Sequence, residues 1–166
     1  MIGLSNIIIR ILILKEELII LGLQRERVFL RLQTVIQDEE GQERYEIKGE
    51  GELLIRNKKT VLTFYEQSEE ERSIRHLIAI SPDRVNINRS GDVQTNQQFI
   101  LHKKTESLIP LPHGNIHMEI KTNEIDYTPI AKNREGKLSI QYEAILNEQI
   151  KRNHKLTLTF YKEERK

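Results

Sequence analysis

The feature that most constrains this chain is an alternation of apolar and polar residues that recurs from Val28 almost to the C-terminus. The alternation is clearest after the corner Pro110-Leu111-Pro112-His113-Gly114, where Ile116, Met118 and Ile120 share one parity. Successive side chains of a strand point to opposite faces of a sheet, so a period of two predicts strands with one buried face. The sequence therefore predicts a sheet that buries one side and shows the other to water.

Turn sequences rich in Gly, Pro, Asn and Asp separate the alternating runs. The runs begin at Val28, Tyr45, Val61, Ile74, Val85, Val93, Ile116, Leu138 and Leu156. About eight to ten short strands with regular turns and no helical period between them are typical of all-β barrels and sandwiches. Even meandering favours an antiparallel up-and-down β-barrel, because closing the sheet removes its exposed edges. The interior of such a barrel is either filled by side chains or holds one small ligand.

Three segments depart from simple alternation. Gly49 and Gly51 lie on the apolar parity within one predicted strand, where glycine indicates a sharp bend or, as the alternative, close approach of a ligand to the backbone. The segment between Ile100 and Pro110 shows no alternation and is predicted to be a spacer. Residues 147–153 are predicted to be a polar loop.

Residues 1–26 differ from the rest of the chain. Two apolar blocks, 7–14 and 18–21, are separated by Lys15-Glu16-Glu17. A spanning helix needs about 20 predominantly apolar residues, and charges near its centre are costly, so no transmembrane anchor is expected. The uncharged start and the absence of a small-residue cleavage site also disfavour a signal peptide. These observations predict a cytoplasmic protein.

The N-terminal stretch is open to three interpretations. It is an amphipathic helix packed on the barrel, a mobile tail, or an upstream extension that the domain does not need. We expect a helical extension outside the barrel, so that residues 1–26 form the extension and residues 27–166 form the barrel domain. An apolar helix there offers a surface for a homo-oligomer or for a protein partner.

Composition excludes several classes of function. Lys and Arg number 26 and Asp and Glu number 25, which gives a formal net charge of +1. This balance gives no electrostatic indication of a nucleic-acid partner. The chain has no cysteine, which rules out a disulfide framework and a thiolate zinc site.

Residue types used in catalysis are present, but not in catalytic patterns. No histidine pair has the spacing of a metal motif, and no serine lies in G-x-S-x-G. Glu50 and Glu52 occupy the polar parity of their strand, where a solvated face is the expected role. Gly49-Glu50-Gly51 lacks the following helix that a phosphate-binding loop needs. The sequence therefore predicts no metal, no cofactor and no enzymatic activity. The histidines considered are His76, His102, His113, His117 and His154.

Four segments resemble a known bacterial family. They are Arg89-Ser90-Gly91 with the following Phe99, the corner Pro112-His113-Gly114 with its strand, the run from Gly136 to Tyr142, and the terminal strand 153–160. Together they resemble the YwiB-like family, a domain of unknown function (DUF1934), over roughly residues 27–161. That family's corner usually reads Thr-Pro-aromatic-Gly, whereas this chain has Leu111 and His113. The resemblance implies a calycin or lipocalin-like barrel and brings no catalytic residues.

Polar side chains on the apolar parity give the one candidate site. His76, Arg89, Gln97 and Tyr142 each fall on the predicted inner face of a strand. Either they satisfy one another's hydrogen bonds or contact water at the barrel's end, or they line a cavity in which Arg89 pairs with a ligand carboxylate or phosphate. In the second case the other three side chains orient the ligand.

Two functions follow from these alternatives. The preferred prediction is non-catalytic binding of a small, partly apolar or amphipathic ligand inside the barrel. The alternative is a structural or protein-interaction module with a packed interior and no small-molecule ligand.

Overall fold

The structure, a computed structural model, describes residues 24–67, 73–131 and 134–162, together with Gly3, Asn6 and Arg10. In the three continuous ranges every regular element is a β-strand, which confirms the all-β prediction. The ten strands are β1 (Gln24–Asp38), β2 (Gly41–Arg56), β3 (Lys59–Gln67), β4 (Ser73–Ile80), β5 (Val85–Gly91), β6 (Thr95–Phe99), β7 (Lys104–Leu111), β8 (Gly114–Thr128), β9 (Glu135–Leu146) and β10 (Ile150–Lys162).

All ten strands belong to one antiparallel sheet in the order β6-β5-β4-β3-β2-β1-β10-β9-β8-β7. Strands that follow one another in the chain therefore pair, except β6 and β7 at the two ends of the order, and β1 and β10 join the two halves along a ten-pair register. The sheet curls until β6 lies beside β7. The two strands form no ladder of backbone hydrogen bonds, and the hydroxyl of Thr105 donates a hydrogen bond to the backbone carbonyl of Gln98 across the gap. The result is a nearly closed barrel with a seam between β6 and β7.

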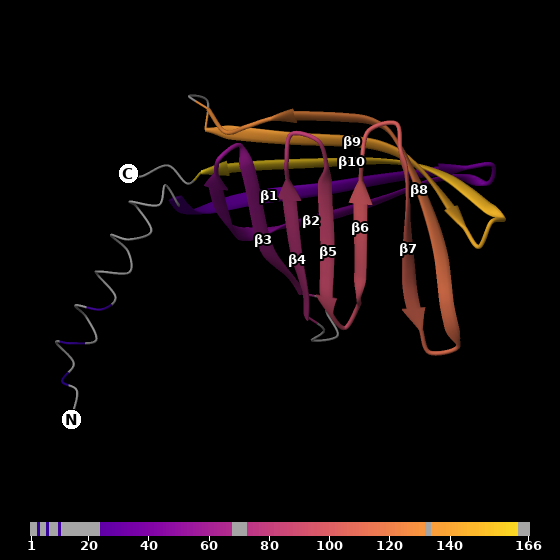
Figure 1. Cartoon of the computed structure of the whole chain (residues 1–166), viewed down its shortest axis with the longest axis horizontal. Helices are drawn as coiled ribbons and strands as arrows, with labels where there is room; N and C mark the ends of the chain where they lie inside the picture. The colour runs from indigo at the N-terminus through magenta and orange to yellow at the C-terminus, as the bar shows by residue number, and fades with distance from the viewer. Residues whose placement is uncertain are drawn as a thin grey trace.

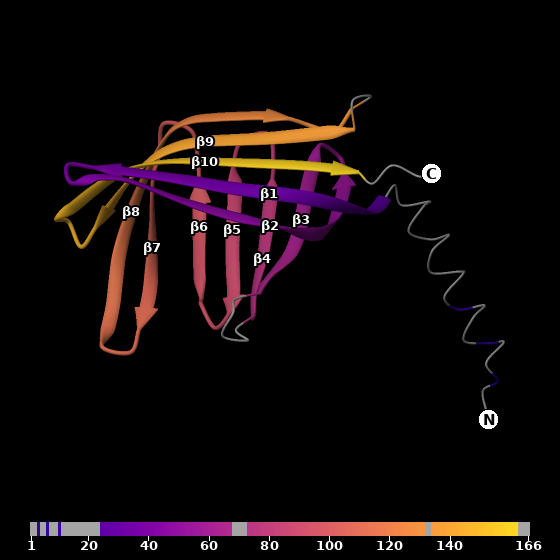
Figure 2. The same ribbon diagram turned by 180° about the vertical axis from the view of Figure 1, so that it is seen from behind.

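Two sets of strands cross within this barrel. Figures 1 and 2 show β4, β5 and β6 nearly upright, with β1, β10 and β9 crossing them at a steep angle. The long strand β8 changes direction between these sets, and its pairing with β9 slips at a bulge between Thr122 and Glu124. A bulge bends its strand, which is how a sheet turns a barrel corner.

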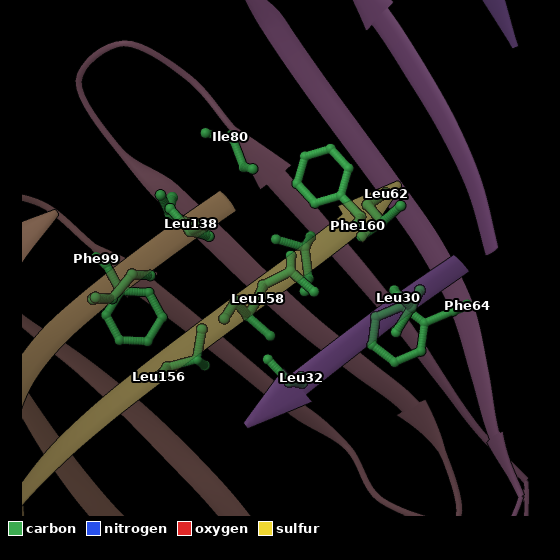
Figure 3. Packing of buried hydrophobic residues seen from close by; sticks show 14 of the residues in the cluster. Leu30, Leu32, Leu62, Phe64, Ile80, Phe99, Leu138, Leu156, Leu158 and Phe160 are labelled. Atoms are coloured by element: carbon green, nitrogen blue, oxygen red, sulfur yellow. The ribbon is translucent and has the colours of Figure 1, made fainter. Parts of the chain in front are cut away.

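The core lies between the crossing strands. Side chains of β1, β3, β9 and β10 meet there, as Figure 3 shows for Leu30, Leu62, Leu138 and Leu158. Each of these four residues is at most 3% exposed. Burying one such side chain stabilises the fold by roughly 1.5–3 kcal/mol, so the alternation read from the sequence is the main source of stability.

Tight turns connect the strands where the sequence predicted them. Asn57 and Lys58 both have positive φ, 47° and 64°, between β2 and β3. A two-residue loop with both φ values positive twists in the sense that suits a hairpin. Gly91 has φ 112° and ends β5, which agrees with the turn signal at Arg89-Ser90-Gly91-Asp92.

The predicted spacer after Ile100 is wrong, because residues 104–111 form strand β7. Its inner positions include the polar Thr105 and Ser107, which pair with Ile120 and Met118 of β8, so the alternation of hydrophobicity is weak. Pro110, which the sequence analysis assigned to the corner, lies within β7, and β7 is the last strand of the sheet order, where a missing backbone N–H is tolerated. The predicted polar loop is likewise shorter, since β10 already begins at Ile150.

The predicted helical extension over residues 1–26 lies almost entirely outside the described residues, which begin continuously at Gln24. Strand β1 starts at that residue, four positions before the alternation first becomes clear at Val28. Within the described ranges, no helix has the length and apolar character required to cross a bilayer.

Candidate functional site

Strand register arranges the inner face of β2 to β6 in rows. The two rows nearest the β4–β5 turn are almost wholly apolar: Ile55, Thr60, Ile80, Val85 and Phe99, then Leu53, Leu62, Ile78, Ile87 and Gln97. The third row, called the Arg89 row below, contains Gly51, Phe64, His76, Arg89 and Thr95. A fourth, partial row of Glu66, Ile74 and Gly91 lies nearest the far end of these strands. The inner face therefore changes from apolar to polar along the strands.

The fourth row marks one end of the barrel, which we call the mouth. Glu66 and Ile74 are half-buried and Gly91 is exposed, whereas the first two rows are buried apart from the partly exposed Ile55. In Figure 1 the lower ends of β4, β5 and β6 project below the level at which β1 and β10 cross. Polar groups of the Arg89 row therefore lie between the packed core and the solvent.

His76 lies in the middle of the Arg89 row and is only 2% exposed. Its ring stacks on Phe64 with centroids 4.5 Å apart, and its Nε2 is 2.9 Å from Oε2 of Glu66. Burial lowers the pKa of His76, and the hydrogen bond to Glu66 partly opposes this effect. A carboxylate can only accept, so in the neutral ring Nε2 donates and Nδ1 is left as an acceptor. This buried Nδ1 has no hydrogen-bond partner.

Arg89 is the cross-strand neighbour of His76 and is half-buried. Its Nε donates to Oγ1 of Thr95 at 3.2 Å, and among the described residues its guanidinium forms no ion pair. The Arg89 charge also opposes protonation of His76, and it offsets a small part of the rise that burial causes in the pKa of Tyr142. Two of the four predicted site residues are therefore direct neighbours.

Gln97 and Tyr142 flank this pair more loosely. Gln97 lies one row deeper on β6, is 7% exposed, and its Nε2 is 3.8 Å from the sulfur of Met118. Tyr142 comes from β9 and packs against Phe99 with ring centroids 4.8 Å apart. Burial raises the pKa of Tyr142 to about 12, so its hydroxyl stays protonated at neutral pH. No direct hydrogen bond joins Gln97 or Tyr142 to Arg89 or His76 in the described part of the chain.

Sequence reasoning missed two side chains of this region. Glu66 orients His76, and it shares the inward parity of Leu62 and Phe64, so the alternation itself carried the signal. His154 stacks on Tyr142 with centroids 4.7 Å apart, and it likewise shares the inward parity of its strand. Each of the two residues lies at the end of an apolar run, where a polar side chain is usually solvated.

The two inward glycines of β2 differ in their surroundings. A Cβ at Gly51 would lie 2.6 Å from the carbonyl oxygen of Thr63, whereas a Cβ at Gly49 would meet nothing within 4 Å. The pairing of β2 with β3 starts only at Gly51, so the two strands fork there. Gly51 allows the backbones of β2 and β3 to approach closely, and Gly49 faces open space.

A hollow of about 640 Å³ lies at this fork. Most of its lining comes from the outer face of the sheet, including Arg27, Glu50, Tyr65 and Arg75, and Gly51 and Phe64 of the Arg89 row also border it. Its volume falls in the range of small-molecule sites. The hollow therefore opens mainly on the outer face of the sheet, beside Gly51 at one end of the Arg89 row.

The chemistry available at the row is recognition through hydrogen bonds and charge. Within the described ranges no group of three or more His, Asp and Glu side chains is placed to hold a metal ion. Arg89 is a permanent cation, His76 Nδ1 is a free acceptor, and Gln97 supplies an amide. This set can orient an anion but contains no activated nucleophile.

Comparison with known proteins identifies relatives of the same architecture. Residues 30–158 match the family described as a domain of unknown function (DUF1934). The chain is 24% identical over 137 residues to the uncharacterized beta-barrel protein YwiB of Bacillus subtilis (strain 168), covering 82% of this chain and 94% of that protein. The crystal structure of the ywiB protein from Bacillus subtilis superposes with a TM-score of 0.72 at 22% identity, covering 86% of this chain and 96% of that one. This likeness shows a common fold.

Proposed function

This chain belongs to the DUF1934 family, a domain of unknown function, and from that premise we propose that it binds a small, partly apolar organic anion at the mouth of its barrel without chemical conversion. Arg89 pairs with the carboxylate, sulfonate or phosphate of the ligand. His76, Gln97 and Tyr142 complete the polar surroundings of that group.

The observation that carries the proposal is the unpaired state of Arg89. Its guanidinium is half-buried on the inner face, donates once to Thr95, and forms no ion pair with a described residue. A charge withdrawn from water without a partner is costly, whereas an oxyanion accepts two parallel hydrogen bonds from a guanidinium. A bound anion would therefore supply the ion-pair partner that Arg89 lacks among the described residues.

His76 supports the same function. Its buried Nδ1 has no partner although its other nitrogen is fixed by Glu66. Most buried polar atoms of side chains have a hydrogen-bond partner, so an atom without one calls for an explanation such as a bound ligand or water. A hydroxyl or N–H group of the ligand, or a bound water, gives this acceptor its missing donor.

Two weaker considerations, the analogy with calycin barrels and the predicted cytoplasmic location, agree with the proposal. The likeness to calycin barrels that the family resemblance implies favours one small ligand per barrel, which is an argument from fold alone. The absence of cysteine accords with the reducing cytoplasm predicted from the sequence.

A matched pair of fluorescent dyes tests the proposal. 1-Anilinonaphthalene-8-sulfonate carries a sulfonate, and N-phenyl-1-naphthylamine has the same rings without it. We expect Arg89→Met to weaken binding of the sulfonate dye by about tenfold or more, because a hydrogen-bonded charge contributes roughly 1.5–3 kcal/mol. Binding of the neutral dye should change less than twofold, as measured by fluorescence titration.

Arg84→Met is the control for loss of a positive charge. Arg84 lies in the turn at the opposite end of β5 and pairs with Asp83 on the surface, so its replacement should leave both affinities unchanged. Thermal unfolding of each variant establishes that it is folded. A folded Arg89→Met protein that binds the sulfonate dye as tightly as the wild type contradicts the proposal.

The alternative function is a protein-interaction module. It is favoured by the apolar side chains on β7, where Leu108 and Leu111 are 60% and 49% exposed. Isolated exposed leucines are common on protein surfaces, whereas a half-buried arginine without an acidic partner is not. We therefore place ligand binding first.

A further inference from the structure

The geometry points to the orientation of the ligand, and this inference rests on the proposed function. We infer that the ligand is an amphipathic anion that binds with its charged end inward at Arg89 and its apolar body at the mouth, over Gly49 on the inner face of β2.

The first argument is that the two apolar rows nearest the β4–β5 turn leave no space for a ligand. Leu53, Leu62, Ile78 and Ile87 are between 0% and 4% exposed and belong to one continuous core. Protein interiors of this kind are packed at the density of organic crystals. An apolar tail directed past Arg89 toward the β4–β5 turn would have to displace these side chains.

The second argument is the space at Gly49. This residue shares the inward face with Leu30, its partner on β1, yet a Cβ there would meet no atom within 4 Å. Farther along β2 toward the β1–β2 turn, Ile47 packs against the edge of the core and Tyr45 is 56% exposed. The inner face of β2 from Tyr45 to Gly49 is therefore an open surface with an aliphatic and an aromatic side chain.

The third argument is the fork. Residues 41–50 of β2 pair with β1 alone in the described part of the chain, so no strand of β3 to β6 borders the open surface before the pairing with β3 begins at Gly51. Strands are about 4.8 Å apart, which puts Arg89 on β5 roughly 14 Å from β2. An arginine side chain and a two- or three-ring body together span that distance.

The inference selects a chemical class. The ligand has one oxyanion and a flat or short aliphatic body, and a long acyl chain is disfavoured because only the mouth is open. Glu66 lies beside His76 on the mouth side of the Arg89 row, and its side chain is 32% exposed. A second negative charge on the body would lie near this carboxylate, so a monoanion is favoured over a dianion.

Gly49→Leu tests this orientation with the same two dyes. A leucine side chain would fill the open space without meeting a neighbour, so the protein should keep its unfolding temperature. Binding of both dyes should weaken by about tenfold, the equivalent of losing roughly 50 Å² of apolar contact. Arg89→Met, in contrast, should weaken the sulfonate dye alone.

The two proposals fail separately in this design. If folded Gly49→Leu protein binds both dyes as the wild type does, the orientation is contradicted while the role of Arg89 is unaffected. If Gly49→Leu weakens both dyes and Arg89→Met changes neither, the anion site is contradicted.

A measurement on the wild-type protein covers the case in which Gly49→Leu does not fold. Titration with N-phenyl-1-naphthylamine should shift the backbone amide resonances of Ile47 and Gly49 most strongly. Shifts confined to deep residues such as Leu62 and Ile87 would overturn the inference, because they would place the apolar body in the core.

Discussion

At the scale of single side chains, His154 shows how burial disfavours a charge. His154 stacks on Tyr142 inside the barrel, and its Nδ1 has no hydrogen-bond partner. Burial, with a smaller contribution from the charge of Arg152, lowers the pKa of His154 to about 4. The ring is therefore neutral in the folded protein over most of the physiological range.

This low pKa predicts a pH dependence of stability. In the unfolded chain His154 titrates near pH 6.5, so between that pH and about 4 the unfolded state binds the extra proton. The stability contributed by the neutral ring is present above pH 6.5 and is lost as the pH falls through 4. We expect the loss to be about 2 kcal/mol, measured as the free energy of unfolding in urea at pH 7 and pH 4.

His154→Phe provides the comparison, because it keeps a ring against Tyr142 and removes the titration. Carboxylates titrate in the same range in both proteins, so only the difference between the two curves belongs to His154. Parallel curves for wild type and variant would show that burial of His154 does not depress its pKa in solution.

At the scale of single elements, β2 contains a matched pair of glycines with opposite surroundings. Gly51→Ala would force a Cβ to within 2.6 Å of the backbone oxygen of Thr63, and we expect it to destabilise the fold by about 1–3 kcal/mol. Gly49→Ala meets open space and should be neutral or slightly stabilising, since alanine restricts the unfolded chain. Thermal unfolding compares the two, and equal effects would refute the assigned roles.

Strands were predictable from the sequence where apolar residues alternate and were missed where the interior is polar. The alternation of Leu138, Ile140, Tyr142 and Ala144 identifies β9 without ambiguity. Strand β7 was missed because the polar residues Thr105 and Ser107 take its inner positions. They face inward because they pair with Ile120 and Met118 of β8, which a pattern of hydrophobicity within residues 104–111 does not reveal. Parity also placed His76, Arg89, Gln97 and Tyr142 on inner faces, as the structure does.

The arrangement of these four residues was beyond local sequence reasoning. That His76 and Arg89 are direct neighbours follows from the register of β4 with β5, which is set by the length of their turn. Gln97 and Tyr142 lie farther away because each comes from a different strand or row. Parity indicates which side chains point inward, and only register tells which of them meet.

At the scale of the whole molecule, backbone hydrogen bonding is most extensive at β1 and β10 and least extensive at the seam between β6 and β7. Strands β1 and β10 are hydrogen-bonded on both sides along most of their length, whereas β6 and β7 each have one full ladder. Exchange of backbone amides follows the local free energy of opening. We expect amides of β1 and β10 to exchange at least about 100-fold more slowly than those of β6 by hydrogen–deuterium exchange.

Ligand binding should alter this pattern in a specific way if it engages Arg89 on β5. A ligand stabilises the state that binds it, so protection should rise in β5 and β6 beyond any global increase. Uniform protection of β6 and β10 without a ligand would instead show that the seam is closed in solution.

The central pair of this sheet has a consequence for the order in which the protein is made. Strand β1 is the first and β10 the last of the ten strands along the chain, yet they lie side by side in the ladder. During synthesis β1 can pair with β2, but its second edge has no native partner until β10 leaves the ribosome. The hairpins of the two halves can form early, whereas the joining of the halves waits for the last strand. Translation therefore exposes an unfinished sheet edge for nearly the whole length of the chain, and the final strand both completes the core and covers that edge.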